Sequence, residues 1–281
     1  MKLMMSLFLG IVQGIAEFLP ISSSGHLSIL QNLIKIGYEE DKNLLFDVLL
    51  HLGTLISVCV VYRAEIKAMI SDGLEFLRMR NDPDSDEPVA LKPQVRVLLF
   101  VLAGTLPLII ALIFSGFVSQ LFSRTGFIGF ALIVTGGILF VSSRYIQTGN
   151  KTEKTMTMKD AIIIGLAQAV AIIPGLSRSG TTISVGLARG LSKEFAVRFS
   201  LLLSIPAVFG ATIVSLYKAI KGGADFSLFP VYLAGFVVAA VVGFFAIQLI
   251  RRMMAKDGIG KFAYYCWGVG ALTLILSLVL K

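Results

Sequence analysis

Long apolar runs set the strongest limit on how this chain can fold. Six of them cover residues 44–62, 95–118, 126–145, 195–217, 229–250 and 263–280. Each is long enough to cross the hydrocarbon core of a bilayer as a helix, which takes roughly 20 apolar residues. Only 15% of the 281 residues are charged and 56% are apolar, whereas soluble domains carry about 25% charge. Most water-soluble folds, disordered chains and fibrous repeats are therefore excluded, and the sequence predicts an all-α polytopic membrane protein with six transmembrane helices.

Two further apolar regions are broken by short polar loops. Residues 3–37 are interrupted at positions 20–26, and residues 160–187 are interrupted at positions 174–180. Neither half of either region is long enough to cross a bilayer alone. Non-helical backbone at membrane depth persists only where it is buried in protein or lines a wet cavity. Both regions are therefore predicted to be re-entrant helix–loop–helix hairpins.

The two broken regions resemble each other at an offset of 155 residues. The matching pairs are Gly10 with Gly165, Gln13 with Gln168, Ala16 with Ala171, Ser22 with Ser177, Ser24 with Ser179 and Gly25 with Gly180. Three crossings follow each hairpin, and because three is odd, the second copy is predicted to be inverted. We expect one integral membrane domain, 1–281, made of inverted repeats 1–145 and 160–281, with the hairpin tips meeting near the midplane. Transporters of this architecture bind their solutes at that place.

The distribution of basic residues predicts the orientation in the membrane. Connections 63–96, 144–159, 188–198 and 251–262 hold 17 Lys and Arg, whereas the alternate connections and the C-terminus hold five. The positive-inside rule places the first set in the cytoplasm, with residues 78–94 as a solvated loop. The net charge of +8 does not indicate nucleic-acid binding, because no basic stripe interleaved with aromatic residues is present.

A single carboxylate stands out in the first broken region. Glu17 lies in an apolar helix, with Gln13 one turn earlier on the same face. Placing an ionised side chain at membrane depth costs about 2.5–3.5 kcal/mol on insertion scales. Glu17 therefore needs a cation, a proton or a polar cavity, and it is a candidate metal ligand or general base. A polar pair that only packs two helices together is the structural alternative.

Hydroxyl groups and an imidazole follow Glu17 within nine residues. Ser22, Ser23 and Ser24 precede a glycine and His26, and such a loop near a helix N-terminus suits an oxyanion. His26 can serve as general acid or base, or can attack phosphorus directly. Helix capping by the serines and a structural role for the histidine are the alternatives.

The second tip contributes a cation. Arg178 lies between Ser177 and Ser179, in a segment otherwise uncharged from 161 to 188. A guanidinium group suits phosphate, although Arg178 could instead serve only as the ionic partner of Glu17. His51 lies four residues after Asp47 and is a candidate to line the site, with a solvated Asp–His pair as the alternative. Together the tips hold the groups that phosphate chemistry requires.

These motifs are similar to those of the undecaprenyl-diphosphatase family, also known as bacitracin resistance proteins. The resemblance is carried by QGIAEFLPISSSGHL at 13–27 and PGLSRSGTT at 174–182, with support from 46–54 and 199–210. Some members of the family have Glu where Gln13 stands, which makes Glu17 the more critical of the pair.

The resemblance implies hydrolysis of undecaprenyl diphosphate to the monophosphate carrier lipid of peptidoglycan and cell-wall synthesis, and hence bacitracin resistance. It implies a divalent cation, Mg²⁺ or Ca²⁺, held by Glu17 and Gln13, a location in the bacterial plasma membrane and a site open to the outer face. By the same resemblance the catalytic residues are Glu17, Ser23, His26 and Arg178, and the substrate-binding residues are Gln13, Ser22, Ser24, His51, Ser177, Ser179 and Thr182. The nucleophile, Ser23 or His26, and a homodimer are left open. The alternative function is a lipid-phosphate flippase or secondary transporter on the same scaffold.

Overall fold

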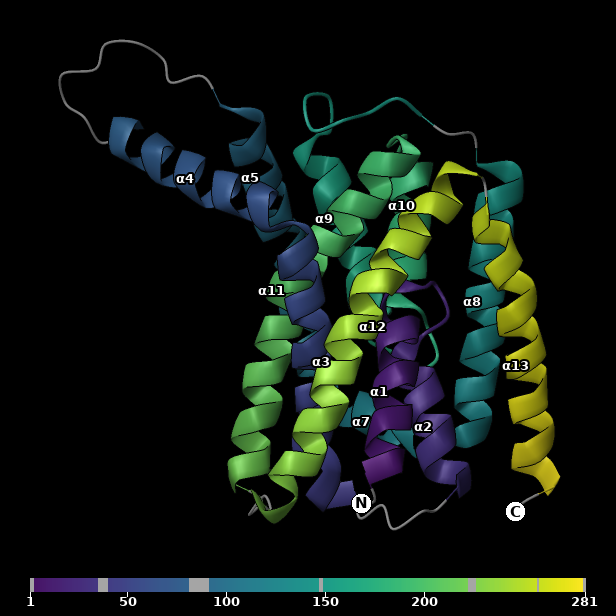
Figure 1. Cartoon of the computed structure of the whole chain (residues 1–281). Helices are drawn as coiled ribbons and strands as arrows, with labels where there is room; N and C mark the ends of the chain where they lie inside the picture. Colours follow the sequence, from purple (N-terminus) through teal and green to yellow (C-terminus); the bar gives the residue numbers. More distant parts are fainter. Residues whose placement is uncertain are drawn as a thin grey trace.

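The computed structural model is a bundle of helices (Figure 1) and describes residues 3–34, 40–80, 91–146, 149–221, 226–256 and 258–279. In these ranges the helices are α1 (Leu3–Phe18), α2 (Ser23–Ile34), α3 (Glu40–Val61), α4 (Arg63–Arg80), α5 (Pro93–Thr105), α6 (Leu108–Ile113), α7 (Ser115–Phe122), α8 (Thr125–Tyr145), α9 (Met158–Val170), α10 (Arg178–Ala188), α11 (Lys193–Lys221), α12 (Phe229–Ala255) and α13 (Lys261–Val279). Two short 3₁₀ turns, η1 (Phe226–Leu228) and η2 (Gly258–Gly260), precede α12 and α13. No sheet strand forms in the described part of the chain.

The prediction of six helices able to cross a membrane is confirmed. Among the described residues, six apolar spans of sufficient length lie at Leu44–Val61, Pro93–Ala111, Thr125–Tyr145, Lys193–Lys221, Phe229–Ala255 and Gly258–Val279. The run predicted over 95–118 is not one helix, however. It ends as α5 at Thr105 and continues as the short helices α6 and α7. Pro107 explains the break, because proline has no backbone N–H to continue the helical hydrogen bonds and its ring clashes with the carbonyl one turn earlier.

The connection 63–96 contains a helix that the apolar pattern did not predict. Helix α4 projects away from the bundle (Figure 1) and packs partly against α5. It carries charged residues throughout, so no apolar run reveals it. Residues 81–90 of the predicted solvated loop lie outside the described residues.

Each broken region forms two helices joined by a short loop. Helices α1 and α2 flank residues 19–22, and α9 and α10 flank residues 171–177. Ser22 Oγ accepts a hydrogen bond from the Gly25 N–H at 3.2 Å, and Ser177 Oγ accepts one from the Gly180 N–H at 3.1 Å. Both serines thus cap the following helix in the same way, and the next residues, Ser23 and Arg178, begin α2 and α10.

The two loops are in contact with each other. A Cβ atom at Gly25 would lie 3.0 Å from Gly175 Cα, and one at Gly180 would lie 3.1 Å from Pro20 Cβ. Ser179 Oγ also donates a hydrogen bond to the Leu19 carbonyl at 3.3 Å. Segments about 155 residues apart in sequence are therefore held together at the centre of the molecule.

Glycine pairs allow the first helix of each hairpin to approach a neighbouring helix closely. A Cβ atom at Gly10 of α1 would lie 2.6 Å from the carbonyl oxygen of Gly235 in α12. A Cβ atom at Gly165 of α9 would lie only 2.2 Å from the carbonyl oxygen of Gly104 in α5. Small residues of this kind are common where membrane helices meet. The hydrophobic effect does not drive helices together in lipid, so they associate through close van der Waals packing, which small residues permit.

Gly165→Ala is expected to lower stability by about 1–3 kcal/mol, because its Cβ overlaps the backbone of α5 and the helices must separate. The control is Gly137→Ala in α8, where an added Cβ would meet no heavy atom within 4 Å in the described structure. That change is expected to be neutral or to stabilise by about 0.5–1 kcal/mol. Melting temperatures of the purified variants in detergent would measure both; equal values would contradict the close α5–α9 contact.

Candidate active site

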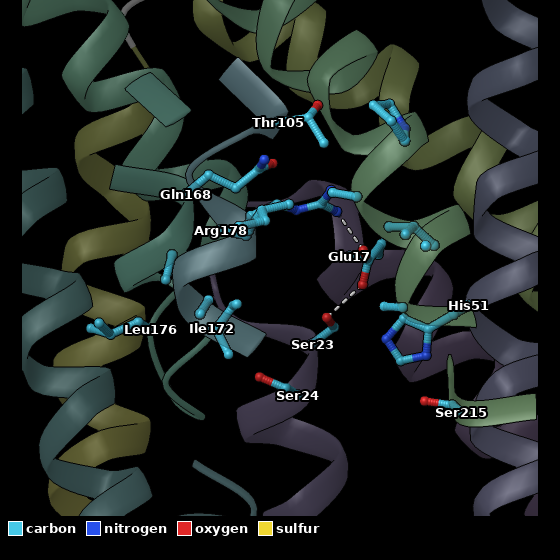
Figure 2. Close-up of a pocket in the computed structure, with 18 of the residues that line it drawn as sticks. Glu17, Ser23, Ser24, His51, Thr105, Gln168, Ile172, Leu176, Arg178 and Ser215 are labelled. Atoms are coloured by element: carbon cyan, nitrogen blue, oxygen red, sulfur yellow. Dashed lines mark hydrogen bonds and ion pairs between the residues drawn. The ribbon is translucent and has the colours of Figure 1, made fainter. Parts of the chain in front are cut away.

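A cavity of about 590 Å³ lies beside the contact between the two loops. Its polar end is formed by Glu17, Ser22, Ser23, Ser24, His51, Gln168, Ser177 and Arg178. Its remaining wall is largely apolar and comes from α6 and from residues 206–215 of α11. Figure 2 shows the charged and hydroxyl groups directed toward one another across the polar end. The cavity is thus amphipathic, with polar groups concentrated where the loops meet.

Glu17 is the centre of this polar cluster. Its carboxylate accepts hydrogen bonds from Arg178 Nη2 at 2.5 Å, Ser23 Oγ at 2.6 Å and Gln13 Nε2 at 3.0 Å. The Glu17 side chain is 6% exposed and the Arg178 side chain 18%. A buried carboxylate persists only when paired and hydrogen-bonded, and three donors from both halves of the chain meet that requirement.

Ser23 is positioned by the backbone of the first loop. Ser22 adopts a positive φ of 70°, a conformation that few non-glycine residues take up. The turn brings Ser23, the first residue of α2, into the cavity with its hydroxyl on Glu17. A carboxylate bonded to a serine hydroxyl can remove its proton and make it a nucleophile. The N-terminus of α2 also favours negative charge at this point.

Arg178 is positioned in the same way by the second loop. The Ser177 N–H donates to Thr135 Oγ1 at 3.1 Å, and that hydroxyl donates to the Gly175 carbonyl at 2.9 Å. Helix α8 therefore anchors the loop directly before Arg178. Only Nη2 of the guanidinium is used by Glu17. Nη1 is buried and finds no hydrogen-bond partner among the described residues, so it is available to a ligand.

His26 does not share this cavity with Ser23. Its Nδ1 lies 2.8 Å from the Ser22 carbonyl, and its Nε2 lies 2.8 Å from the Tyr265 hydroxyl, with the two rings stacked. A carbonyl only accepts, so Nδ1 carries the proton and Nε2 accepts from Tyr265. His26 thereby fixes the strained residue that precedes Ser23, and it is not among the residues that line the cavity.

The remaining predicted residues divide into two groups. His51, Ser24 and Ser177 line the cavity. His51 donates to the backbone carbonyl of Asp47 at 2.8 Å. Ser179 and Thr182 do not line the cavity and instead hold the second hairpin: Ser179 bonds the Leu19 carbonyl, and the Thr182 and Ser200 hydroxyls lie 2.6 Å apart.

Four polar residues that line the cavity were not in the predicted set: Thr105, Ser115, Gln168 and Ser215. Gln168 and Thr105 both line the cavity (Figure 2). Gln168 had a signal in the sequence, because it is the repeat equivalent of Gln13. Thr105 had none, because its position depends on the end of α5 before Pro107.

The chemistry of the donors fits a divalent cation only if the ligand supplies part of the coordination. Within the described residues, no group of three or more His, Cys, Asp and Glu side chains could hold a metal ion. Glu17 is the one carboxylate among the described cavity-lining residues, and Gln13 Oε1 is buried without a hydrogen-bond partner in the same described part. Mg²⁺ is often bound by one or two carboxylates together with phosphate oxygens.

Comparison with known proteins places these residues in a family. Residues 6–272 match the family model described as bacitracin resistance protein BacA. The chain is 40% identical over 277 residues to the undecaprenyl-diphosphatase of Alkaliphilus metalliredigens, with 98% of each chain covered. It is 40% identical over 280 residues to that of Methanobrevibacter smithii, with 99% of each covered. Over 276 residues it is 39% identical to that of Carboxydothermus hydrogenoformans, covering 97% of this chain and 96% of the relative.

The ion pair between the loops makes a prediction about stability. Arg178→Met leaves the Glu17 carboxylate buried without its cation and is expected to cost about 3–5 kcal/mol. The double variant Glu17→Gln, Arg178→Met removes both charges and is expected to regain most of that loss. Melting temperatures in detergent measure the difference. A double variant as unstable as the single one would show that Arg178 does not stabilise the protein through its ion pair with Glu17.

Proposed function

The chain belongs to the bacitracin resistance protein BacA family, and we propose that it is an undecaprenyl-diphosphatase. The proposed reaction converts undecaprenyl diphosphate and water into undecaprenyl phosphate and inorganic phosphate, returning the carrier lipid to peptidoglycan and cell-wall synthesis. The observation that carries the proposal is the Ser23 hydroxyl, 2.6 Å from Glu17, beside a partly unpaired arginine in an amphipathic cavity.

The proposed reaction begins at Ser23. Glu17 takes the hydroxyl proton while Ser23 Oγ attacks the terminal phosphorus, and the bond from that phosphorus to the bridging oxygen breaks. Undecaprenyl phosphate leaves, and a phosphate group remains on Ser23. The leaving undecaprenyl phosphate takes the proton from Glu17, which is then ionised again. Glu17 next deprotonates the water that attacks the same phosphorus. The bond from phosphorus to Ser23 Oγ breaks, inorganic phosphate leaves, and Ser23 takes its proton back from Glu17. Dividing the reaction in this way replaces one high barrier by two lower ones.

Arg178 supports both steps by stabilising charge. Phosphoryl transfer depends mainly on positioning and on neutralising the charge of the phosphoryl oxygens. Arg178 Nη1 is a buried donor with no partner among the described residues and can bind one of these oxygens, while Nη2 keeps Glu17 in place. The N-termini of α2 and α10 add partial positive charge on the same side.

The geometry favours Ser23 over His26 as the nucleophile. Both ring nitrogens of His26 are engaged, with the Ser22 carbonyl and the Tyr265 hydroxyl. Attack by His26 would require the ring to leave both partners. We assign His26 instead the role of fixing the loop, because a displacement of about 1 Å in a reacting group can lower a rate about a hundredfold.

We further propose that a divalent cation, Mg²⁺ or Ca²⁺, binds together with the substrate. Glu17 and Gln13 Oε1 would hold it, along with phosphate oxygens of the substrate. When bound, such an ion neutralises phosphate charge and polarises the terminal phosphoryl group.

The two halves support an inverted-repeat arrangement with re-entrant hairpins in the plasma membrane. Equivalent serines cap α2 and α10, and the equivalent Gly10 and Gly165 contact α12 and α5. The basic residues gather at the α4 end of the bundle, whereas the cavity follows α11 from Pro206 to Ser215, toward the opposite end. We therefore propose that the cavity opens toward the outer face.

Purified protein in detergent is expected to release one inorganic phosphate per undecaprenyl diphosphate, over many turnovers. Detergent removes the sidedness that transport requires, so turnover there identifies an enzyme. Binding of the lipid with no phosphate release would favour the flippase or transporter instead.

Arg178→Ala removes the positive charge that is proposed to bind the phosphate, and it is expected to reduce phosphate release at least about a hundredfold.

The nucleophile can be identified by trapping the phosphorylated protein. With substrate labelled in its terminal phosphate, an acid quench is expected to retain the label, because phosphoserine survives acid and phosphohistidine does not. Ser23→Ala should abolish the label and lower turnover by about a thousandfold or more. Label that is lost in acid but retained in alkali would assign the attack to His26.

A further inference from the structure

Gln168 is a buried amide that the protein itself leaves unused. It is 1% exposed, and neither its Nε2 nor its Oε1 has a hydrogen-bond partner among the residues that the structure describes. The side chain lines the cavity, and Figure 2 shows its amide directed inward beside Arg178 and Thr105. Burying an amide without partners is unfavourable, so such a group at a cavity wall indicates a ligand.

The internal repeat explains why this amide has no partner in the described part of the chain. In the first half, Gln13 Nε2 donates to Glu17, four residues later on the same helix. In the second half the residue four positions after Gln168 is Ile172, which also lines the cavity. The same glutamine is thus present in both halves, but only the first half keeps the carboxylate that satisfies it.

The surroundings of Gln168 specify the chemistry of the ligand. The neighbouring Arg178 Nη1 is also a buried donor without a partner in the described structure. Glu17 is the one acid among the described residues of the cavity, and it is already bonded to Arg178, Ser23 and Gln13. One wall therefore presents an amide N–H and a guanidinium N–H. Among the described lining residues no acid other than Glu17 faces them, so the wall suits an oxyanion.

We propose that Gln168 is a substrate-binding residue whose amide N–H donates to an oxygen of the lipid diphosphate, next to Arg178. This inference rests on the proposed function and deepens it, because it assigns a residue to the wall opposite Ser23. Arg178 and Gln168 hold the phosphate group from one side while Ser23 approaches from the other. Charge-assisted hydrogen bonds of this kind also orient the phosphorus for attack.

The test compares Gln168→Met and Gln168→Glu with wild type, using a polyprenyl diphosphate in detergent. Methionine keeps the length of the side chain and removes both hydrogen-bonding groups, so kcat/KM is expected to fall about 10- to 100-fold. The melting temperature of the substrate-free protein should stay the same or rise, because an unsatisfied buried amide is gone. Glutamate should lower kcat/KM further, because its charge repels phosphate.

Gln248→Met provides the matched control. Gln248 is a half-buried glutamine in α12 that lines a separate cavity beside Arg198 and Arg251, and its kcat/KM should stay within about twofold of wild type. Gln168→Met with kcat/KM within twofold of wild type would overturn the inference, as would a loss of activity accompanied by a lowered melting temperature. An inactive wild-type protein would instead overturn the proposed function, so the two failures are distinguishable.

Discussion

The buried ion pair between Glu17 and Arg178 is the interaction on which the rest of the site depends. The two residues are 161 positions apart in sequence and come from different hairpins. Neither charge is stable alone at membrane depth, because desolvation costs several kcal/mol per ion. Each hairpin tip therefore requires the other, and the contacts of Gly25 with Gly175 and of Gly180 with Pro20 let them approach closely enough. The geometry of the pair then places Ser23 beside a carboxylate whose charge is already compensated.

The chemistry arises where the two halves differ. The repeat supplies the same frame twice, with capping serines, close-packed glycines and a glutamine on the helix before each loop. At equivalent positions the two halves carry different groups. Ser23 in the first half corresponds to Arg178 in the second, and Glu17 corresponds to Ile172. A symmetric site would hold two acids or two cations, and like charges at such short range repel strongly in a medium of low dielectric. The asymmetry gives one wall that activates a hydroxyl and another that binds the phosphate.

The sequence predicts the parts of this structure that depend on local composition. Six apolar runs predict six crossing helices, and the polar loops at Pro20 and Pro174 predict breaks, because both follow from the cost of exposing backbone to lipid. The helix α4 and the break at Pro107 were missed, since the first lacks an apolar run and the second lies inside one. The orientation of His26 depends on Tyr265, 239 residues later, and no local pattern contains that information. Gln168, by contrast, was predictable from the repeat once Ile172 was compared with Glu17.

The amphipathic cavity matches a ligand that is polar at one end and apolar at the other. Pro206 lies inside α11, and three of the residues that follow it on the cavity wall, Ala207, Gly210 and Ala211, are small. Small side chains leave the width that a polyprenyl chain needs, and the proline weakens the helix at the level of the loops. A lipid diphosphate bound here would keep its chain against apolar side chains while its phosphates reach Arg178. The apolar wall also limits water near Glu17, which strengthens each charged contact with the phosphoryl group. The same exclusion of water that makes Glu17 costly to bury therefore makes it effective beside Ser23.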